Sequence, residues 1–169
     1  MKISMYSMSV EAFVPTLRAL AKMLDKAAQH ASAKKFDPSV LVNARIAPDM
    51  YPLVKQVQLA CDFAKNSAGR LAAQDPPRFE DNEKTLEELA ARIAKTLDYL
   101  QGVRAGALEG SEDRDVKLSL PNNTSLEFKG LPFLKDWALP NFYFHVVTAY
   151  DILRHNGVEI GKRDYLSPG

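Results

Sequence analysis

The sequence has few of the features that mark secreted, membrane-spanning or nucleic-acid-binding proteins. It contains one cysteine, Cys61, so no disulfide can form within the chain. No apolar run approaches the roughly 20 residues that a membrane-spanning helix needs, and the first residues lack the apolar core of a signal peptide. Basic and acidic residues number 22 and 21, without a densely basic stretch. We therefore expect a cytoplasmic protein with neither membrane nor nucleic acid as a partner.

The composition is that of an ordinary globular domain. Hydrophobic residues make up 46 % of the chain and charged residues 25 %, which are usual proportions for a soluble fold. A chain of 169 residues buries roughly 70 % of the surface that its unfolded form exposes, so a core can form without disulfides or metal. We expect a single domain covering residues 1–169.

Apolar residues recur every three or four positions in four segments, which predicts four helices. The segments are residues 10–34, a stretch that starts between 49 and 52 and ends at 71, residues 81–104, and residues 139–155. Asp81 is a suitable N-cap for the third helix, and Asn156-Gly157 is a strong stop for the fourth. Asp37-Pro38 predicts a short connecting helix, and residues 158–169 a strap that docks back on the bundle.

Residues 105–135 interrupt the helical pattern and predict a β-hairpin between the third and fourth helices. Apolar and polar residues alternate on both sides of a turn-forming stretch, residues 121–124. The alternating apolar residues are Val116, Leu118, Leu120, Leu126 and Phe128. The predicted fold is mainly α: a four-helix bundle with one small inserted β-hairpin.

Six segments carry a family resemblance that spans essentially the whole chain. They are residues 47–50 (APDM), 56–65 (QVQLACDFAK), 79–81 (FED), 142–145 (FYFH), 150–157 (YDILRHNG) and 160–166 (IGKRDYL). Together they resemble an uncharacterised branch of the DinB-like, or YfiT-like, four-helix-bundle superfamily. The resemblance implies a four-helix bundle that is often dimeric, so we expect a homodimer. It also implies, for many superfamily members, a divalent metal bound by three histidines, which some relatives use for thiol-dependent transferase or isomerase chemistry.

The histidines of this chain do not fit that metal site. The resemblance implies one ligand from the second helix and two from the fourth, four residues apart. Here the second helix has no histidine, and Ala149 stands four residues after His145. His145 and His155 would lie ~15 Å apart along one helix, whereas the ligands of one ion must converge. We therefore expect no metal at this site and no cofactor.

Five residues are candidates for binding a small organic molecule: His145, Asp62, Gln58, Lys65 and Tyr150. His145 borders the apolar stripe of the fourth helix, where it could shuttle a proton, act as one metal ligand, donate to a bound ligand or make a structural hydrogen bond. Gln58, Asp62 and Lys65 share one face of the second helix. Asp62 either meets His145 across the bundle or pairs with Lys65 on a solvated face.

Three functions remain open. The favoured one is a binding bundle, with a cleft near His145 and Asp62 for a small organic ligand. The second is a transferase-like or hydrolase-like enzyme with an atypical or metal-free site around His145, which requires Asp62 and His145 to converge in one accessible cavity. The third is a dimeric structural or regulatory protein, which predicts that Tyr143 or Tyr150 is buried between subunits.

Overall fold

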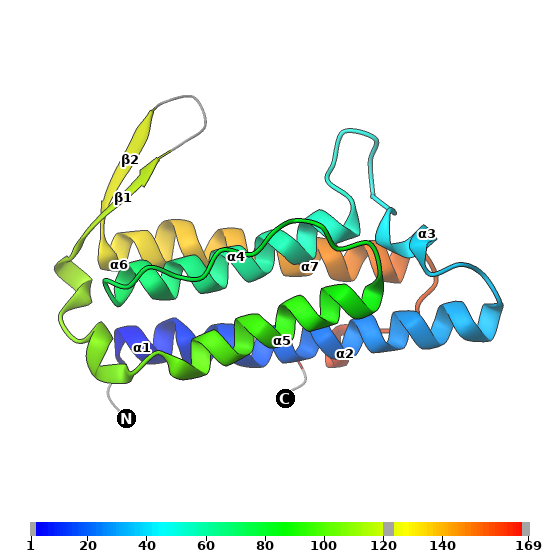
Figure 1. The fold of residues 1–169 in the computed structure, drawn as a ribbon, viewed down its shortest axis with the longest axis horizontal. Coiled ribbons are helices and arrows are strands. Elements are labelled where there is room, and N and C mark those ends of the chain that lie inside the picture. The colour runs from blue at the N-terminus through cyan, green and yellow to red at the C-terminus, as the bar shows by residue number, and fades with distance from the viewer. Residues whose placement is uncertain (1–2, 120–123, 167–169) are drawn as a thin grey trace.

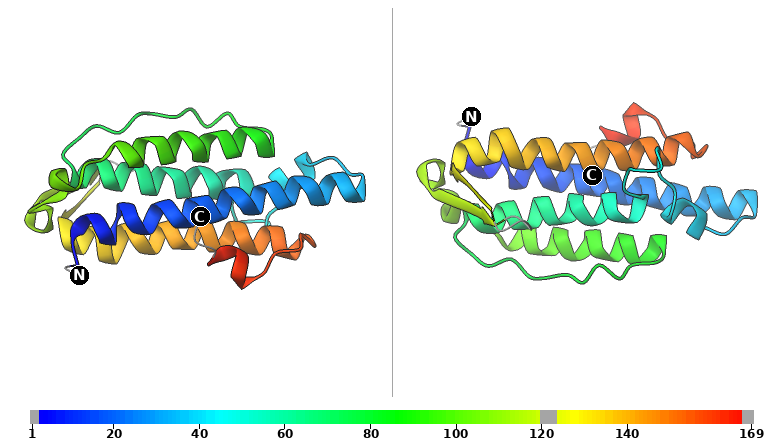
Figure 2. Two further views of the ribbon diagram at one scale, coloured as in Figure 1. Left: turned by 90° about the horizontal axis from the view of Figure 1, so that it is seen from below. Right: turned by 90° about the horizontal axis from the view of Figure 1, so that it is seen from above.

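The computed structural model describes residues 3–119 and 124–166, and four long helices dominate it. They lie side by side in an elongated bundle (Figures 1 and 2): α2 (Val10–Lys34), α4 (Leu53–Leu71), α5 (Leu86–Gly102) and α7 (Leu139–His155). The shorter elements are α1 (Met5–Met8), α3 (Ser39–Val42), η1 (Ala105–Leu108), η2 (Ser111–Asp113), α6 (Gly130–Pro132), η3 (Phe133–Ala138) and α8 (Lys162–Tyr165). The predicted mainly α fold is confirmed.

The core lies on the axis of the bundle. α2 packs against α5 and α7, and α4 packs against the same two helices, so the four helices enclose one apolar interior. Side chains that recur at the helical period are completely buried, among them Phe13, Leu17, Leu20, Leu53 and Val57. In the described residues, no helix is both long and apolar enough to span a membrane.

α4 and α5 run in the same direction, which requires a long connection between them. Residues 72–85, here called the linker, return along the outside of these two helices (Figure 2). α4 has 19 residues and is about 28 Å long, and an extended segment of the linker's length can span that distance. The sequence did not reveal this geometry, because a parallel and an antiparallel neighbour have the same hydrophobic pattern.

The prediction that Asp81 caps the third helix is wrong, because Asp81 lies in the middle of the linker. α5 begins at Leu86, and Thr85 is its N-cap. The Thr85 hydroxyl accepts a hydrogen bond from the Glu88 amide at 3.1 Å, and the Glu88 carboxylate accepts one from the Thr85 amide at 3.1 Å. This reciprocal capping box satisfies two backbone donors that have no partner inside the helix.

The last long helix, α7, has the predicted bounds of residues 139 and 155, and two short helical elements lead into it. The chain is already helical at Gly130 and passes through the wide π turn of η3 before it enters α7. Pro140 has no amide hydrogen, so the regular hydrogen-bond pattern is interrupted at this junction. Gly130 is required for the close packing of α6 on η2, because a Cβ atom there would collide with the carbonyl oxygen of Ser111.

The predicted hairpin is present and stands at one end of the bundle (Figure 1). β1 (Asp115–Ser119) and β2 (Ser125–Lys129) pair antiparallel, with Val116 opposite Phe128 and Leu118 opposite Leu126. Leu120 and residues 121–123 of the predicted turn lie outside the described residues. The ring of Phe128 lies 5.9 Å from that of Trp137 in η3, so the hairpin packs against the start of the last helix.

Candidate functional site

His145 lies between α7 and α4, where its partner is Gln56. The side chain is buried, its Nδ1 lies 2.8 Å from Oε1 of Gln56, and its ring stacks on Phe63 at 5.6 Å. The amide nitrogen of Gln56 donates to the carbonyl oxygen of Tyr51 at 3.1 Å, so its oxygen is the atom that faces the imidazole. This network assigns the imidazole proton to Nδ1 and leaves a lone pair on Nε2. Burial lowers the pKa of His145 to about 4, so the ring is neutral at neutral pH.

Asp62 has other partners, and the Asp62–His145 pair considered from the sequence does not form. Oδ1 of Asp62 lies 3.1 Å from Arg92 and 3.5 Å from Lys65. The pair with Lys65 was the alternative, but it is not on a solvated face, because the Lys65 side chain is only 4 % exposed. Burial lowers the pKa of Lys65, and the nearby Asp62 carboxylate opposes that shift.

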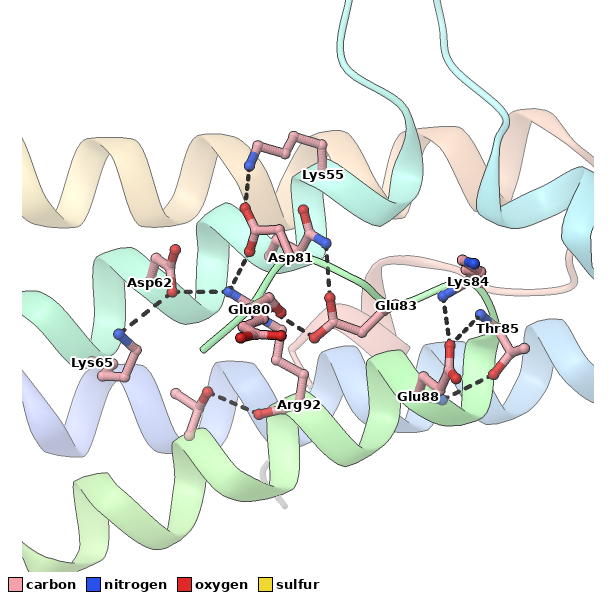
Figure 3. A network of polar contacts seen from close by, with 12 residues as sticks. Lys55, Asp62, Lys65, Glu80, Asp81, Glu83, Lys84, Thr85, Glu88 and Arg92 are labelled. Atoms are coloured by element: carbon pink, nitrogen blue, oxygen red, sulfur yellow. Dashed lines mark hydrogen bonds and ion pairs between the residues drawn. The ribbon is translucent and has the colours of Figure 1, made fainter. Parts of the chain in front are cut away.

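Arg92 is the centre of a polar network that ties the linker to the bundle (Figure 3). Its side chain is 1 % exposed, and it lies 2.9 Å from Asp81, 2.9 Å from Glu83 and 3.1 Å from Asp62. It also donates to the carbonyl oxygen of Glu80 at 3.1 Å. Since Asp81 and Glu83 belong to the linker, the buried guanidinium fixes the linker against α4 and α5.

Further contacts complete this network. Gln58 donates to Glu83 at 2.8 Å, and Lys55 pairs with Asp81 at 2.6 Å. The ring of Phe79, also in the linker, lies 5.0 Å from the Lys65 ammonium. Burial alone would raise the pKa of Glu83, but its hydrogen bonds from Arg92 and Gln58 hold it below its ordinary value. The network therefore favours the ionised form of Glu83 and positions the linker.

A pocket of about 260 Å³ lies between α4, the hairpin and η3, and we call it the hairpin pocket. α4 contributes polar side chains, and aromatic and aliphatic side chains form the rest of its wall. Its lining residues are Leu59, Asp62, Phe63, Asn66, Ser67, Arg70, Leu118, Ser119, Phe133 and Trp137. The hairpin and the helix that follows it therefore close a site that α4 alone would leave open.

Two polar groups of the hairpin pocket lack a partner within the described residues. Ser67 is 1 % exposed, yet its hydroxyl makes no hydrogen bond there. Arg70 makes no ion pair or side-chain hydrogen bond in the same part of the chain, and burial lowers the pKa of its guanidinium. Ser67 is a buried group, and buried polar groups in folded proteins are normally hydrogen-bonded. Arg70 is exposed at the mouth of the pocket, so both groups are available to a ligand.

A second cavity, of about 610 Å³, adjoins the hairpin pocket beneath the linker. Asp62, Asn66 and Arg70 line both spaces, and Lys65 and Arg78 line the second. One row of α4 side chains therefore connects an aromatic pocket with a charged one.

The structure separates the five residues predicted to bind a ligand. Asp62 lines the hairpin pocket and Lys65 the adjoining cavity, but Gln58 belongs to the linker network. His145 is absent from the lining of both spaces, although it stacks on Phe63, which lines the first. Tyr150 lies elsewhere, against Tyr165 of α8 at 6.4 Å.

The predicted C-terminal strap, residues 158–169, docks on the bundle through α8, and its last residues, 167–169, lie outside the described residues. This short helix packs on α2, and Asp164 pairs with Lys26 at 2.6 Å. The Tyr150–Tyr165 contact joins the same segment to α7. Tyr150 is therefore half-covered by its own chain.

The functional residues that sequence reasoning missed are Arg92, Arg70 and Trp137. Arg92 had a detectable signal, since it lies three residues after Leu89 on the apolar stripe of α5, where a charge must find partners. Arg70 and Trp137 had none, because they come together only when the hairpin folds beside α4. Within the ranges that the structure describes, no three His, Cys, Asp or Glu residues form a group that could hold a metal ion.

Comparison with known proteins gives a family without an assigned activity. Residues 5–166 match the family model described as "Domain of unknown function (DUF1993)". The chain is similar to a crystal structure of a DinB family member from Shewanella denitrificans, with 42 % identity and a TM-score of 0.90. That match covers 97 % of this chain and 92 % of the other. No curated protein matches.

Proposed function

Because this chain belongs to the DUF1993 family, whose name states no activity, we propose a function from its site: it binds a small organic molecule in the hairpin pocket. The observation that carries this proposal is the lining of the pocket. Ser67 and Arg70, which have no hydrogen-bond partner within the described residues, share this lining with the aromatic side chains of Phe63, Phe133 and Trp137. Ligand sites commonly combine such an apolar wall with a few convergent polar groups.

The local backbone supports this choice of site. Trp137 lies in η3, the π turn that precedes α7, and π turns inside helices occur frequently at functional sites. The volume of about 260 Å³ lies just below the usual range for small-molecule sites. We therefore infer a compact ligand, of the size of one or two fused rings.

An acid–base enzyme at His145 is the second candidate, because Nε2 of its neutral ring has no hydrogen-bond partner among the described residues. We place it second for two reasons. A base with a pKa of about 4 is weak at neutral pH, and no carboxylate orients the imidazole, since Gln56 occupies that position. The second helix has no histidine, and Ala149 stands four residues after His145, so we also infer that binding proceeds without a three-histidine metal centre.

The proposal is tested by screening uncharged and charged aromatic fragments against isotope-labelled protein. Trp137 is the only tryptophan of the chain, so its indole N–H signal reports the hairpin pocket alone. We expect fragments that shift this signal to bind wild type and to lose binding in Ser67→Leu, which fills the pocket. Ser32→Leu makes the same change on an exposed position of α2 and should leave binding intact. Hits that bind Ser67→Leu as well as wild type would contradict the proposal.

A further inference from the structure

Arg70 is the cationic residue of the hairpin pocket, and within the described residues it has no acidic partner. It lies in the last turn of α4 and lines both the pocket and the adjoining cavity. Its neighbour Lys65 pairs with Asp62, and Arg92 is surrounded by carboxylates. Arg70 makes no comparable contact, so its positive charge is not neutralised by the protein.

Asp62 lines the same pocket, and its charge would oppose an anion unless it were compensated. Its Oδ1 lies 3.1 Å from Arg92 and 3.5 Å from Lys65 (Figure 3). The whole network contains as many acids as bases, because three cations meet three carboxylates. They are Lys55, Lys65 and Arg92 on one side and Asp62, Asp81 and Glu83 on the other. The network is neutral, and in the adjoining cavity Asp75 and Arg78 carry opposite charges. The charge of Arg70 therefore remains in excess.

The groups around Arg70 suit a molecule that is apolar at one end. The pocket wall beside it includes Phe63, Leu118 and Trp137, and flat aromatic side chains pack well against an aromatic ring. The planar guanidinium can donate two parallel hydrogen bonds to a carboxylate. The unpartnered Ser67 hydroxyl adds a further donor.

We propose that the ligand of the hairpin pocket is a small aromatic carboxylate, whose ring lies against Trp137 and Phe63 and whose carboxylate is bound by Arg70. This inference rests on the proposed function and narrows it to one class of ligand. A single guanidinium opposite an aromatic wall favours an acid with one charge at one end. Arg78, which lines the adjoining cavity, lies on the side where a longer acid would extend.

The test compares 2-naphthoate with 2-naphthamide, which have the same ring system and differ in charge. Both are titrated against the Trp137 indole signal. We expect naphthoate to bind wild type about tenfold more tightly than the amide, because a paired hydrogen bond between a guanidinium and a carboxylate is stronger than one to a neutral amide. Arg70→Gln should reduce naphthoate to the level of the amide, and Arg70→Lys should retain part of the preference.

Arg18→Gln is the matched control, because Arg18 is an exposed cation on α2 outside the pocket. It should keep the full preference for naphthoate. Equal binding of acid and amide to wild type, or an undiminished preference in Arg70→Gln, would overturn the anion inference and leave the proposed pocket intact. If neither compound shifts the signal, the aromatic-acid class is wrong, while hits from the wider fragment screen decide separately whether the pocket binds ligands.

Discussion

His145 illustrates how burial changes the chemistry of one residue. The sequence marked it as a possible proton shuttle, but the fold surrounds it with Phe63, Phe144 and Gln56. A neutral amide oxygen accepts the Nδ1 proton and does not stabilise a positive ring as a carboxylate would. The residue is therefore suited to a neutral, structural or hydrogen-bonding role.

The lowered pKa of His145 predicts a specific dependence of stability on pH. The pKa falls from 6.5 to about 4 in the folded chain, so below pH 6.5 the unfolded chain binds a proton that the folded chain does not. Stability contributed by the neutral ring is thus lost as the pH falls from 6.5 towards 4. We expect a loss of about 2 kcal/mol in unfolding free energy between about pH 7 and about pH 5.

Urea unfolding at the two pH values measures this loss. His145→Gln has no group that titrates at this position, so its unfolding free energy should change by about 2 kcal/mol less. His155→Gln, a change at the exposed end of α7, should retain the dependence of wild type. A titration that places the pKa of His145 near 6.5 would contradict the prediction.

At the scale of single elements, α5 depends on a cap that the hydrophobic pattern did not locate. Thr85 and Glu88 form the capping box, whereas Asp81 interacts with Arg92 and Lys55. Both residue types are good N-caps, so the sequence offered two starts for one helix. Asp81 is not the cap, because its carboxylate pairs with Arg92 and Lys55 and holds the extended linker against the bundle.

Thr85→Ala is expected to lower the free energy of unfolding by about 1 kcal/mol, because it leaves an N-terminal amide of α5 without its partner. Thr85→Ser retains the hydroxyl and should be close to wild type. Asn82→Ala, an exposed change in the same linker, should stay within about 0.5 kcal/mol. The three values are compared by chemical denaturation. A Thr85→Ala variant as stable as Asn82→Ala would show that the capping box contributes nothing.

At the scale of the whole molecule, the aromatic residues of α7 differ in how far their own chain covers them. Tyr150 packs against α8, and Tyr143 is half-buried, with its pKa raised by burial. Their own chain therefore covers much of both rings. Phe144 and Val147 are instead 57 % and 39 % exposed, and they lie three residues apart on one face of α7.

We predict a homodimer with this α7 face in its interface. Light scattering coupled to size exclusion should give twice the mass of one chain for wild type. Phe144→Asp should shift the mass to that of a monomer, because it places a charge where apolar area is buried. Val40→Asp changes a residue of α3 that is also 57 % exposed and should leave the mass unchanged. A monomeric wild type, or a dimeric Phe144→Asp, would contradict the assignment.

The sequence by itself determined the four helices, the hairpin and the loss of the paired fourth-helix histidines. These features are local: the period of Leu86, Leu89 and Ile93 reports a helix wherever its neighbours lie, and Ala149 has no metal-binding atom in any fold. The surroundings of His145, in contrast, depend on residues that are far from it in the sequence. Gln56 and Asp62 are both on α4, and only the helix packing selects the first as the partner.

Only the tertiary structure decided where the candidate site is. Arg70 lies in the last turn of α4, and Trp137 lies in η3, just before α7. They line one pocket because the hairpin, which also contributes to the lining, folds beside them. The parallel course of α4 and α5 likewise became visible only with the linker in place, and it explains why Arg92 is buried among carboxylates. Hydrophobic periodicity specifies which face of a helix is inside, but it does not specify the helix's direction or its neighbours. Contacts between residues far apart in the chain depend on both.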